Sequence, residues 1–354
     1  PRTEDDGPAA YIQRLHQAAQ AGSLEAMLAL ADRYFSGHGI TKSCSAALPY
    51  ARQAAAMLAT EAEKEMRYTA PPASLDLRER HMDARYTAPD ELENDARVIH
   101  MEEDMALRGN PAAQRRMAYR RLVGQGMEAD PEGAFHDFQV GAAQGDAFSI
   151  FNLGYMYLRG MGPVPQNYTE ARKYFEQSAE KGMAAGWNGL GVLHWNGQGG
   201  PANLTAAHEC FLKGAAHNHS DSLYNLALME SNGIGVTKNE TAGLKYYELA
   251  DIHGHFKAAF NLATMYEAGL GTPKDCVMAE RYYRKFFRER GRWPKALTAA
   301  AKSLDDGDAW GALLQYILLA EQGSTAAAVN VGWMLRHGQG FQGARYLDTA
   351  FKFF

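Results

Sequence analysis

The stretch NLGYMYLRGMG at residues 152–162 decides the fold of this chain, because much of the sequence repeats its pattern. It returns as NLALMESNGIG at residues 225–235 and as NLATMYEAGLG at residues 261–271. Recurrence at a fixed period is the signature of a repeat protein, in which one supersecondary unit stacks on the next. The sequence therefore predicts an array of repeats rather than a single globular core.

Two glycines separated by one residue mark each unit, and most neighbouring pairs lie 36 or 37 residues apart. The pairs are Gly37/Gly39, Gly124/Gly126, Gly160/Gly162, Gly197/Gly199, Gly233/Gly235, Gly269/Gly271 and Gly338/Gly340. Glycine readily adopts the positive φ that ends a helix. Each pair therefore predicts the end of one helix and the loop that leads to the next.

A second marker, a small residue followed four positions later by an aromatic residue, keeps the same phase. These pairs are Ala134/Phe138, Ala171/Phe175, Ala207/Phe211, Gly243/Tyr247 and Ala279/Tyr283. Residues at i and i+4 share one face of a helix, so the ring can fill space while the small residue lets a neighbouring backbone approach. Seven glycine pairs in phase with this marker predict a helical hairpin in each repeat.

The hairpin can be placed on the residues of one repeat. Its first helix is predicted over 147–159, and its second begins near Thr169 and ends at Gly182, with Thr169, Thr205 and Thr241 as equivalent N-caps. A single hairpin cannot bury its own apolar face, so successive hairpins stack. The predicted fold is all-α: a right-handed α-solenoid superhelix of helical-hairpin repeats resembling tetratricopeptide repeats.

The phase of the markers divides the chain into four regions. Residues 1–56 hold a linker and the first repeats, 57–109 form a charged insertion, 110–291 form five regular repeats, and 292–354 hold a degenerate repeat followed by a truncated one. The insertion is either mobile or a docking loop, and its polarity favours mobility. In the last region, a helix over 310–321 is apolar on most faces and is expected to be buried.

Composition excludes several classes of function. The formal charge of −5 argues against a nucleic-acid partner, which would select a basic surface. No run of about 18 apolar residues predicts a membrane span. The sequence has no metal-binding, nucleophile-elbow or phosphate-loop motif, so we expect no catalytic, cofactor-binding or metal-binding residues and no enzyme activity.

The cysteines and histidines favour structural roles. Cys44 and Cys276 hold matching places in two distant repeats, which favours buried thiols over a mutual disulfide. Cys210 is expected to be packed. The pair His217 and His219 recurs 36 residues later as His253 and His255. This pattern fits polar turn residues better than a zinc site. Most large aromatic residues, such as Trp187, Trp195 and Tyr224, are expected to pack between helices, and some on first helices could anchor a partner.

Taken together, the repeat markers resemble the Sel-1-like repeat, which covers most of the chain outside 57–109. Several other stretches resemble a subfamily, the Sel-1-like adaptor of the HRD-type ubiquitin ligase. These stretches are 33–39, 43–48, 90–94, 288–293, 306–308 and 315–323.

The resemblance implies a scaffold in the lumen of the endoplasmic reticulum. Its partners would be a membrane-embedded HRD-type ubiquitin ligase, a lectin and misfolded glycoproteins. A homodimer is possible, and the sequence does not decide whether one forms. The composition of both ends predicts a piece of a longer protein, so that membrane association would need segments outside this chain. The alternative is a generic soluble repeat scaffold that serves another complex.

Four Asn-x-Ser/Thr sequons bear on the compartment. Their asparagines are Asn167, Asn203, Asn218 and Asn239. Three of the sequons use a threonine that is also predicted as an N-cap. Helix capping is therefore an alternative to glycosylation as the reason for these threonines. Three sequons lie 36 residues apart, so attached glycans would line one edge of the solenoid and block it for protein docking.

Overall fold

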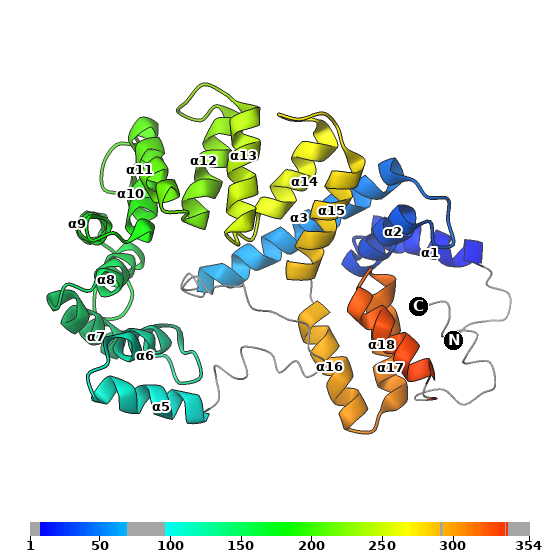
Figure 1. Ribbon diagram of the computed structural model, residues 1–354, viewed down its shortest axis with the longest axis horizontal. Coiled ribbons are helices and arrows are strands. Elements are labelled where there is room, and N and C mark those ends of the chain that lie inside the picture. The colour runs from blue at the N-terminus through cyan, green and yellow to red at the C-terminus, as the bar shows by residue number, and fades with distance from the viewer. Residues whose placement is uncertain (1–7, 69–95, 291–292, 337, 339–354) are drawn as a thin grey trace. The chain divides into compact units, whose positions relative to one another are not determined.

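The computed structural model describes residues 8–68, 96–290, 293–336 and 338 (Figure 1). Regular structure in these stretches is helical throughout, with seventeen helices, and the prediction of an all-α repeat solenoid is confirmed. None of these helices is both long enough and apolar enough to cross a membrane. The described residues form two compact units. Unit 1 combines residues up to Lys64 with residues from Ala259 onward, and unit 2 lies between them in the sequence.

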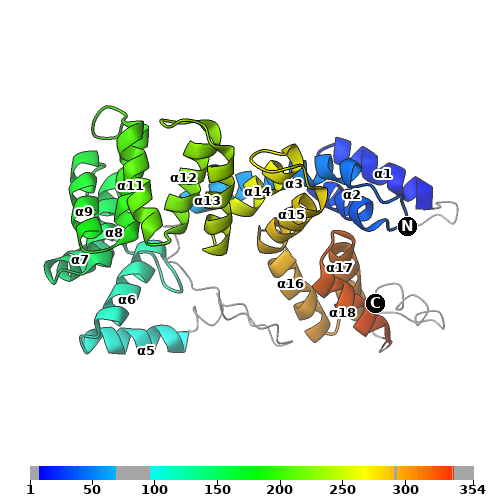
Figure 2. The same ribbon diagram turned by 45° about the horizontal axis from the view of Figure 1, so that its top comes forward.

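Unit 2 is a series of helical hairpins. Its helices are α5 (Ala96–Leu107), α6 (Pro111–Val123), α7 (Pro131–Ala143), α8 (Ala147–Arg159), α9 (Tyr168–Glu180), α10 (Ala184–Asn196), α11 (Leu204–Ala216), α12 (Ser220–Asn232) and α13 (Glu240–Ile252). α10 packs beside α11, and α12 packs beside α13, as Figure 2 shows for the second pair. The even-numbered helices from α6 to α12 are the first helices of their hairpins, and α8 has the predicted bounds.

In unit 2 the N-cap of each second helix is an asparagine or an aspartate, and not the predicted threonine. Asn167 Oδ1 accepts hydrogen bonds from the backbone N–H groups of Thr169 and Glu170, at 3.0 and 3.1 Å. Asn203 and Asn239 cap α11 and α13 in the same way, each at 3.0 Å. The assignment of Thr169, Thr205 and Thr241 as N-caps is therefore wrong by two residues. An extended asparagine places its side-chain oxygen over the first turn, and each threonine lies inside that turn.

The residues that mark the repeat shape the hairpins. The ten paired glycines from Gly124 to Gly271 have φ between 65° and 75°. Buried small and aromatic residues lie between the helices: Ala171, Ala207, Ala279, Phe175, Phe211, Tyr247 and Tyr283. The glycine of a first helix makes room for the ring. A Cβ at Gly154 would lie 2.8 Å from Phe175 Cδ1, and one at Gly191 would lie 2.4 Å from Phe211 Cε1.

The two glycines of a pair have different places in the hairpin, although the sequence pattern does not distinguish them. The first glycine of each pair in unit 2 caps its helix; Gly124 N, for example, donates to the Arg120 carbonyl at 2.8 Å. Gly124, Gly197 and Gly233 are partly buried, and Gly160 is exposed. The second glycine lies in the loop beyond the helix. It is exposed in four consecutive pairs, at Gly126, Gly162, Gly199 and Gly235.

These four exposed glycines therefore differ from the buried small and aromatic markers, and they define the repeat through loop conformation rather than through core packing. Each has a positive φ that other residues rarely adopt. Three of them also lie close to the preceding second helix. A Cβ would be 2.8 Å from Pro131 O at Gly162, 3.1 Å from Tyr168 Cβ at Gly199 and 2.5 Å from Leu204 Cβ at Gly235.

Unit 1 joins the two ends of the chain. Its helices are α1 (Pro8–Gln20), α2 (Leu24–Ser36), most of α3 (Cys44–Tyr68), most of α14 (Ala258–Ala268), α15 (Cys276–Arg290), α16 (Trp293–Asp305), α17 (Ala309–Glu321) and α18 (Thr325–Arg336). One apolar core contains Leu30 and Phe35 of α2 together with Phe286 of α15 and Leu313 of α17. The first repeat therefore packs against helices from the far end of the sequence.

Ion pairs cross the same junction in unit 1. Arg284 Nη1 lies 2.6 Å from Asp32 Oδ1, and the Arg284 guanidinium lies 5.6 Å from the centre of the Phe35 ring. Arg33, which is nearly buried, pairs with Glu321. Charged groups removed from water require such partners. The junction is therefore specified by charge as well as by apolar contact.

Two regions of the sequence differ from expectation or extend beyond the described residues. The predicted burial of the helix over 310–321 is only half right. Leu313 and Leu319 of α17 are buried, whereas Trp310 and Leu318 are 51% and 62% exposed. α17 packs on one side only, so its all-round apolar composition does not translate into burial.

The predicted insertion is helical at its described ends, in α3 and α5, and its residues 69–95 lie outside the described part.

Candidate functional site

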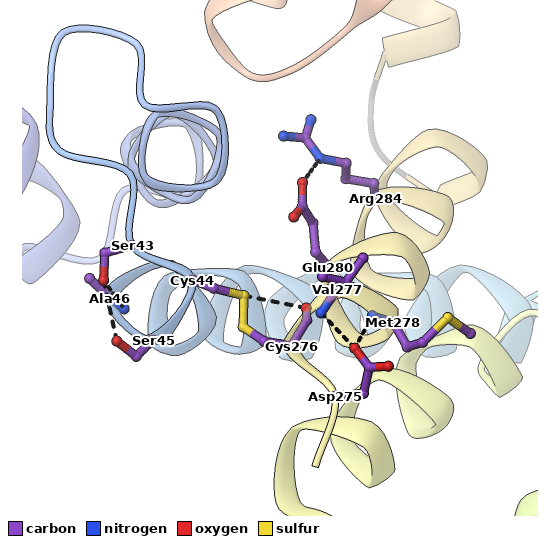
Figure 3. Close-up of a disulfide and its surroundings, with 10 residues drawn as sticks. All are labelled: Ser43, Cys44, Ser45, Ala46, Asp275, Cys276, Val277, Met278, Glu280 and Arg284. Carbon is purple, nitrogen blue, oxygen red and sulfur yellow. Dashed lines mark hydrogen bonds and ion pairs between the residues drawn. A yellow bond between two sulfur atoms is a disulfide. The ribbon is translucent and has the colours of Figure 1, made fainter. Parts of the chain in front are cut away.

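A disulfide lies at the junction within unit 1. Cys44 and Cys276 are bonded, with their Cα atoms 6.2 Å apart, and each is the first residue of its helix (Figure 3). Asp275 caps α15 by accepting hydrogen bonds from Val277 N and Met278 N at 2.9 and 3.0 Å. Ser43 caps α3 in the same manner. The two helix starts thus bring the sulfur atoms together from equivalent places in the repeat.

The disulfide corrects the expectation that Cys44 and Cys276 are buried thiols. That expectation assumed that repeats contact only their neighbours in sequence, which would keep two cysteines 232 residues apart from meeting. Unit 1 breaks this rule because its first repeat packs against α15. The equivalent positions of the two cysteines in their repeats were the feature of the sequence that could have indicated the disulfide. The free cysteine, Cys210, is partly buried, and burial raises the pKa of its thiol.

All four sequon asparagines are exposed. Asn167, Asn203 and Asn239 use Oδ1 as a helix cap, while a glycan would attach to Nδ2. Capping and glycosylation therefore use different atoms of one amide. Asn218 lies in a turn between hairpins, at the other end of the hairpin from the caps, and has φ +57° where neighbouring turns have glycine. Asn167, Asn203 and Asn239 thus lie at equivalent helix starts on one loop edge, where the 36-residue spacing placed them, and Asn218 lies on the other edge.

The first helices of unit 2 carry the aromatic residues considered as anchors. Trp187 is partly exposed, and the Lys213 ammonium lies 4.3 Å from the centre of its ring system. Trp195 packs against Phe211, with ring centres 6.1 Å apart. Tyr224 stacks on His255 at 3.8 Å. These rings pack on side chains of their own unit, and Trp187 and Trp195 also keep a partly exposed face.

The four histidines that recur at 36 residues lie in the turns between α11 and α12 and between α13 and α14. His219 is the N-cap of α12, and its Nδ1 accepts a hydrogen bond from Ser222 N at 3.3 Å. His217 and His253 are the residues that follow α11 and α13. His255 Nδ1 accepts a bond from Lys257 N at 3.3 Å. Across the described residues, no group of three His, Cys, Asp or Glu side chains is arranged to hold a metal ion.

The cap formed by His219 should make unit 2 sensitive to acid. Burial lowers the pKa of His219, and Asp221 opposes this effect. Its folded-state pKa therefore lies below the unfolded value of about 6.5, so the unfolded chain binds the proton more readily. The stabilising effect is complete above pH 6.5 and is lost as the pH falls toward the folded-state pKa. We expect the urea midpoint of His219→Asn to fall less between pH 7.5 and 5 than that of the unmodified protein.

His217→Asn supplies the matched control, because His217 is exposed and lies two residues away. Asparagine is a good N-cap that does not titrate, so His219→Asn keeps the cap while removing the proton site. An identical pH profile for His219→Asn and the unmodified protein would show that the cap does not titrate in this range.

Comparison with known proteins identifies a relative and similar structures. The chain is 28% identical over 186 residues to the ERAD-associated E3 ubiquitin-protein ligase component HRD3B of Arabidopsis thaliana, a match that covers 52% of this chain and 29% of the relative. A protective antigen of uropathogenic Escherichia coli with an SLR fold is 23% identical, with a TM-score of 0.46 over 97% of this chain and 78% of the other. A Sel1 repeat protein from Oxalobacter formigenes is 24% identical, with a TM-score of 0.44 over 75% of this chain and 95% of the other.

A family model also matches the repeat itself. The Sel1 repeat model matches residues 24–57, 111–146, 147–183, 188–219, 220–250 and 256–288. These six segments together make up more than half of the chain, and they contain the capped hairpins of unit 2 as well as α2 and α15 of unit 1. The chain therefore belongs to the Sel1 repeat family.

Proposed function

We propose that this chain is a non-catalytic scaffold of endoplasmic-reticulum-associated degradation, the luminal adaptor of an HRD-type ubiquitin ligase. Its partners would be the membrane-embedded ligase, a lectin of the endoplasmic reticulum and misfolded glycoproteins. The observation that carries the proposal is the similarity to HRD3B, a component of an ERAD-associated ligase. That match spans 29% of the relative's length, so assigning the role of the whole relative to this chain is itself part of the proposal.

Two features of the molecule support a luminal compartment. Disulfides persist in oxidising compartments and are rare in the cytosol, and the chain has the Cys44–Cys276 bond. Four exposed sequons accompany it. The capping role of Asn167, Asn203 and Asn239 explains the asparagines, but helix capping does not require a threonine two residues later. Asp130 and Asp275 cap equivalent helices in which Glu132 and Val277 take the threonine's place.

Glycosylation is expected at the exposed sequons when the chain is made in a eukaryotic secretory host. The intact mass should fall by several glycans after endoglycosidase treatment. The combined variant Thr169→Ala, Thr205→Ala, Thr241→Ala should lose up to three of them while Asn167, Asn203 and Asn239 keep capping their helices. Substituting the asparagines instead would also remove each cap, which is worth about 1 kcal/mol. A mass that endoglycosidase leaves unchanged would favour the generic repeat scaffold.

The adaptor role is tested by capture from cells. The full chain, tagged and expressed in the secretory pathway, should co-purify with the membrane-embedded ligase and a lectin, and its loss should slow the degradation of a misfolded glycoprotein. A glycosylated chain that recovers neither partner and whose loss leaves that degradation unchanged would contradict the proposal.

A further inference from the structure

α17 in unit 1 is built like a second helix of the repeat. Asp308 caps it, with Oδ1 accepting a hydrogen bond from Gly311 N at 2.9 Å, and Ala312 and Tyr316 form the buried small and aromatic pair. The helix has 13 residues, as α9, α11 and α13 have, and Gly323 follows it with a positive φ. Each residue of α17 therefore has an equivalent in the other second helices.

Three apolar residues form an exposed row on α17. Trp310, Leu314 and Leu318 are 51%, 42% and 62% exposed, and their spacing of four residues places them on one face of the helix. We call this row the α17 ridge. The equivalent residues of three other second helices are exposed as well: Thr169, Lys173 and Gln177 in α9, Thr205, Glu209 and Lys213 in α11, and Thr241, Lys245 and Leu249 in α13. Eight of these nine residues are polar, so hairpin packing does not require an apolar row there.

A ridge of this kind is suited to contact with another helix. Side chains four residues apart form the row that fits into the groove of a neighbouring helix. The neighbours α16 and α18 pack against α17 elsewhere and leave the ridge exposed. At 1.5 Å per residue the ridge is about 12 Å long, which a partner helix of roughly three turns would cover. An amphipathic helix with apolar residues at i, i+4 and i+8 has the matching spacing.

Charge indicates which kind of helix fits the ridge. Asp305, Asp306 and Asp308 precede Trp310 in the sequence, and all three are exposed. Lys302, one turn earlier in α16, offsets part of their charge. An apolar ridge with an acidic end is complementary to a helix that has lysine or arginine at the corresponding end.

The same charges argue against a second copy of α17 and against a lipid surface. The one charged residue within α17 is Glu321, which pairs with Arg33. In a parallel pair of α17 helices the aspartates of the two copies would meet, and in an antiparallel pair they would meet the end that holds Glu321. Helices that lie on lipid surfaces have a polar face rich in lysine and arginine, and α17 has neither residue.

We propose that the α17 ridge docks an amphipathic helix of another protein, and that basic residues of this helix lie against Asp305, Asp306 and Asp308. The apolar side of the partner covers Trp310, Leu314 and Leu318. The inference goes beyond the proposed function, because it assigns a docking surface and the chemistry of its partner without reference to a ligase, a lectin or a glycoprotein.

The test measures binding of the full chain to a fluorescent amphipathic helical peptide of leucine and lysine, by anisotropy. The double variant Leu314→Glu, Leu318→Gln should bind roughly tenfold more weakly or worse, because two leucines no longer bury apolar area. α11 has glutamate and α9 has glutamine at these places, so the helix should tolerate both residues. The added negative charge would by itself favour a basic peptide, so weaker binding reports the lost apolar contact.

Leu249→Gln is the matched control, because Leu249 has the place of Leu318 in α13 but lies in a row with Thr241 and Lys245. It should leave binding unchanged. Circular dichroism establishes that each variant is folded.

A second comparison tests the charge. The unmodified chain should prefer the leucine and lysine peptide over a counterpart with glutamate in place of lysine. Asp305→Asn, Asp306→Asn should weaken binding of the basic peptide about threefold at low salt, and the difference should disappear at high salt. Asp308 is left in place because it caps α17.

Three results would overturn the inference: no binding of the basic peptide by the unmodified chain, preference for the glutamate peptide, or equal binding by the leucine double variant and Leu249→Gln. Self-association, or binding to phosphatidylcholine vesicles, that the leucine double variant abolishes in the absence of peptide binding would assign the ridge to a second copy or to lipid. Either result would also overturn it. Glycan mass and ligase capture decide the adaptor role separately.

Discussion

Reduction of the Cys44–Cys276 disulfide is expected to destabilise unit 1 by about 2–5 kcal/mol. The bond closes a loop with a sequence separation of 232 residues. Loop-closure entropy alone gives about 5 kcal/mol for a loop of this length, and measured disulfide effects are usually smaller. Cys44→Ser and Cys276→Ser should lower the urea midpoint to the same extent as reduction does, because all three remove the same covalent link.

Cys210→Ser is the matched control, since Cys210 is the free cysteine and its substitution leaves the disulfide intact. The oxidised protein should have one alkylatable thiol after denaturation and three after reduction. Three alkylatable thiols in protein purified from a secretory host, or an unchanged midpoint on reduction, would contradict the structural role assigned to the bond.

Phe211→Ala is expected to cost about 3–5 kcal/mol, the range for removing a fully buried ring. The ring is completely buried between α11 and its neighbours, and it packs against Trp195 and the backbone of Gly191. Its removal leaves a cavity that the hairpin cannot refill without moving helix α10. Because each repeat is stabilised by its neighbours, the loss should also weaken the adjacent hairpins.

Leu212→Ala tests the next residue of the same helix, where the side chain is 41% exposed. We expect a change below about 1 kcal/mol, since little apolar area returns to water. Urea unfolding followed by far-ultraviolet circular dichroism measures both variants. Similar losses for Phe211→Ala and Leu212→Ala would mean that the repeat marker does not define the core.

Much of the fold follows from local patterns in the sequence. The glycine pairs predicted where the first helices end, and α8 has the bounds expected from Gly160. The pattern did not separate a capping glycine such as Gly160 from a loop glycine such as Gly162, because both have a positive φ. The start of the second helices was placed two residues late, since both asparagine and threonine are good caps. The backbone at Asn167 is extended, as an N-cap requires, so Asn167 rather than Thr169 caps α9.

What the sequence could not predict is contact between distant parts of the chain. A repeat pattern implies contacts between neighbours, so it places Cys44 far from Cys276. The apolar composition of α17 on most of its faces predicts a buried helix. Both conclusions depend on which surfaces of α2, α15 and α17 meet in unit 1.

The assembly of unit 1 from both ends of the chain has a consequence for biosynthesis. The ribosome makes α2 and α3 long before α15, since the two bonded cysteines have a sequence separation of 232 residues. At about 5–20 residues per second, the first repeat waits roughly 10–50 s for the helices that complete its core. During that interval Leu30, Phe35 and the Cys44 thiol lack their partners from α15 and α17. A nascent chain of this protein would thus itself need protection by chaperones and guarding against premature oxidation.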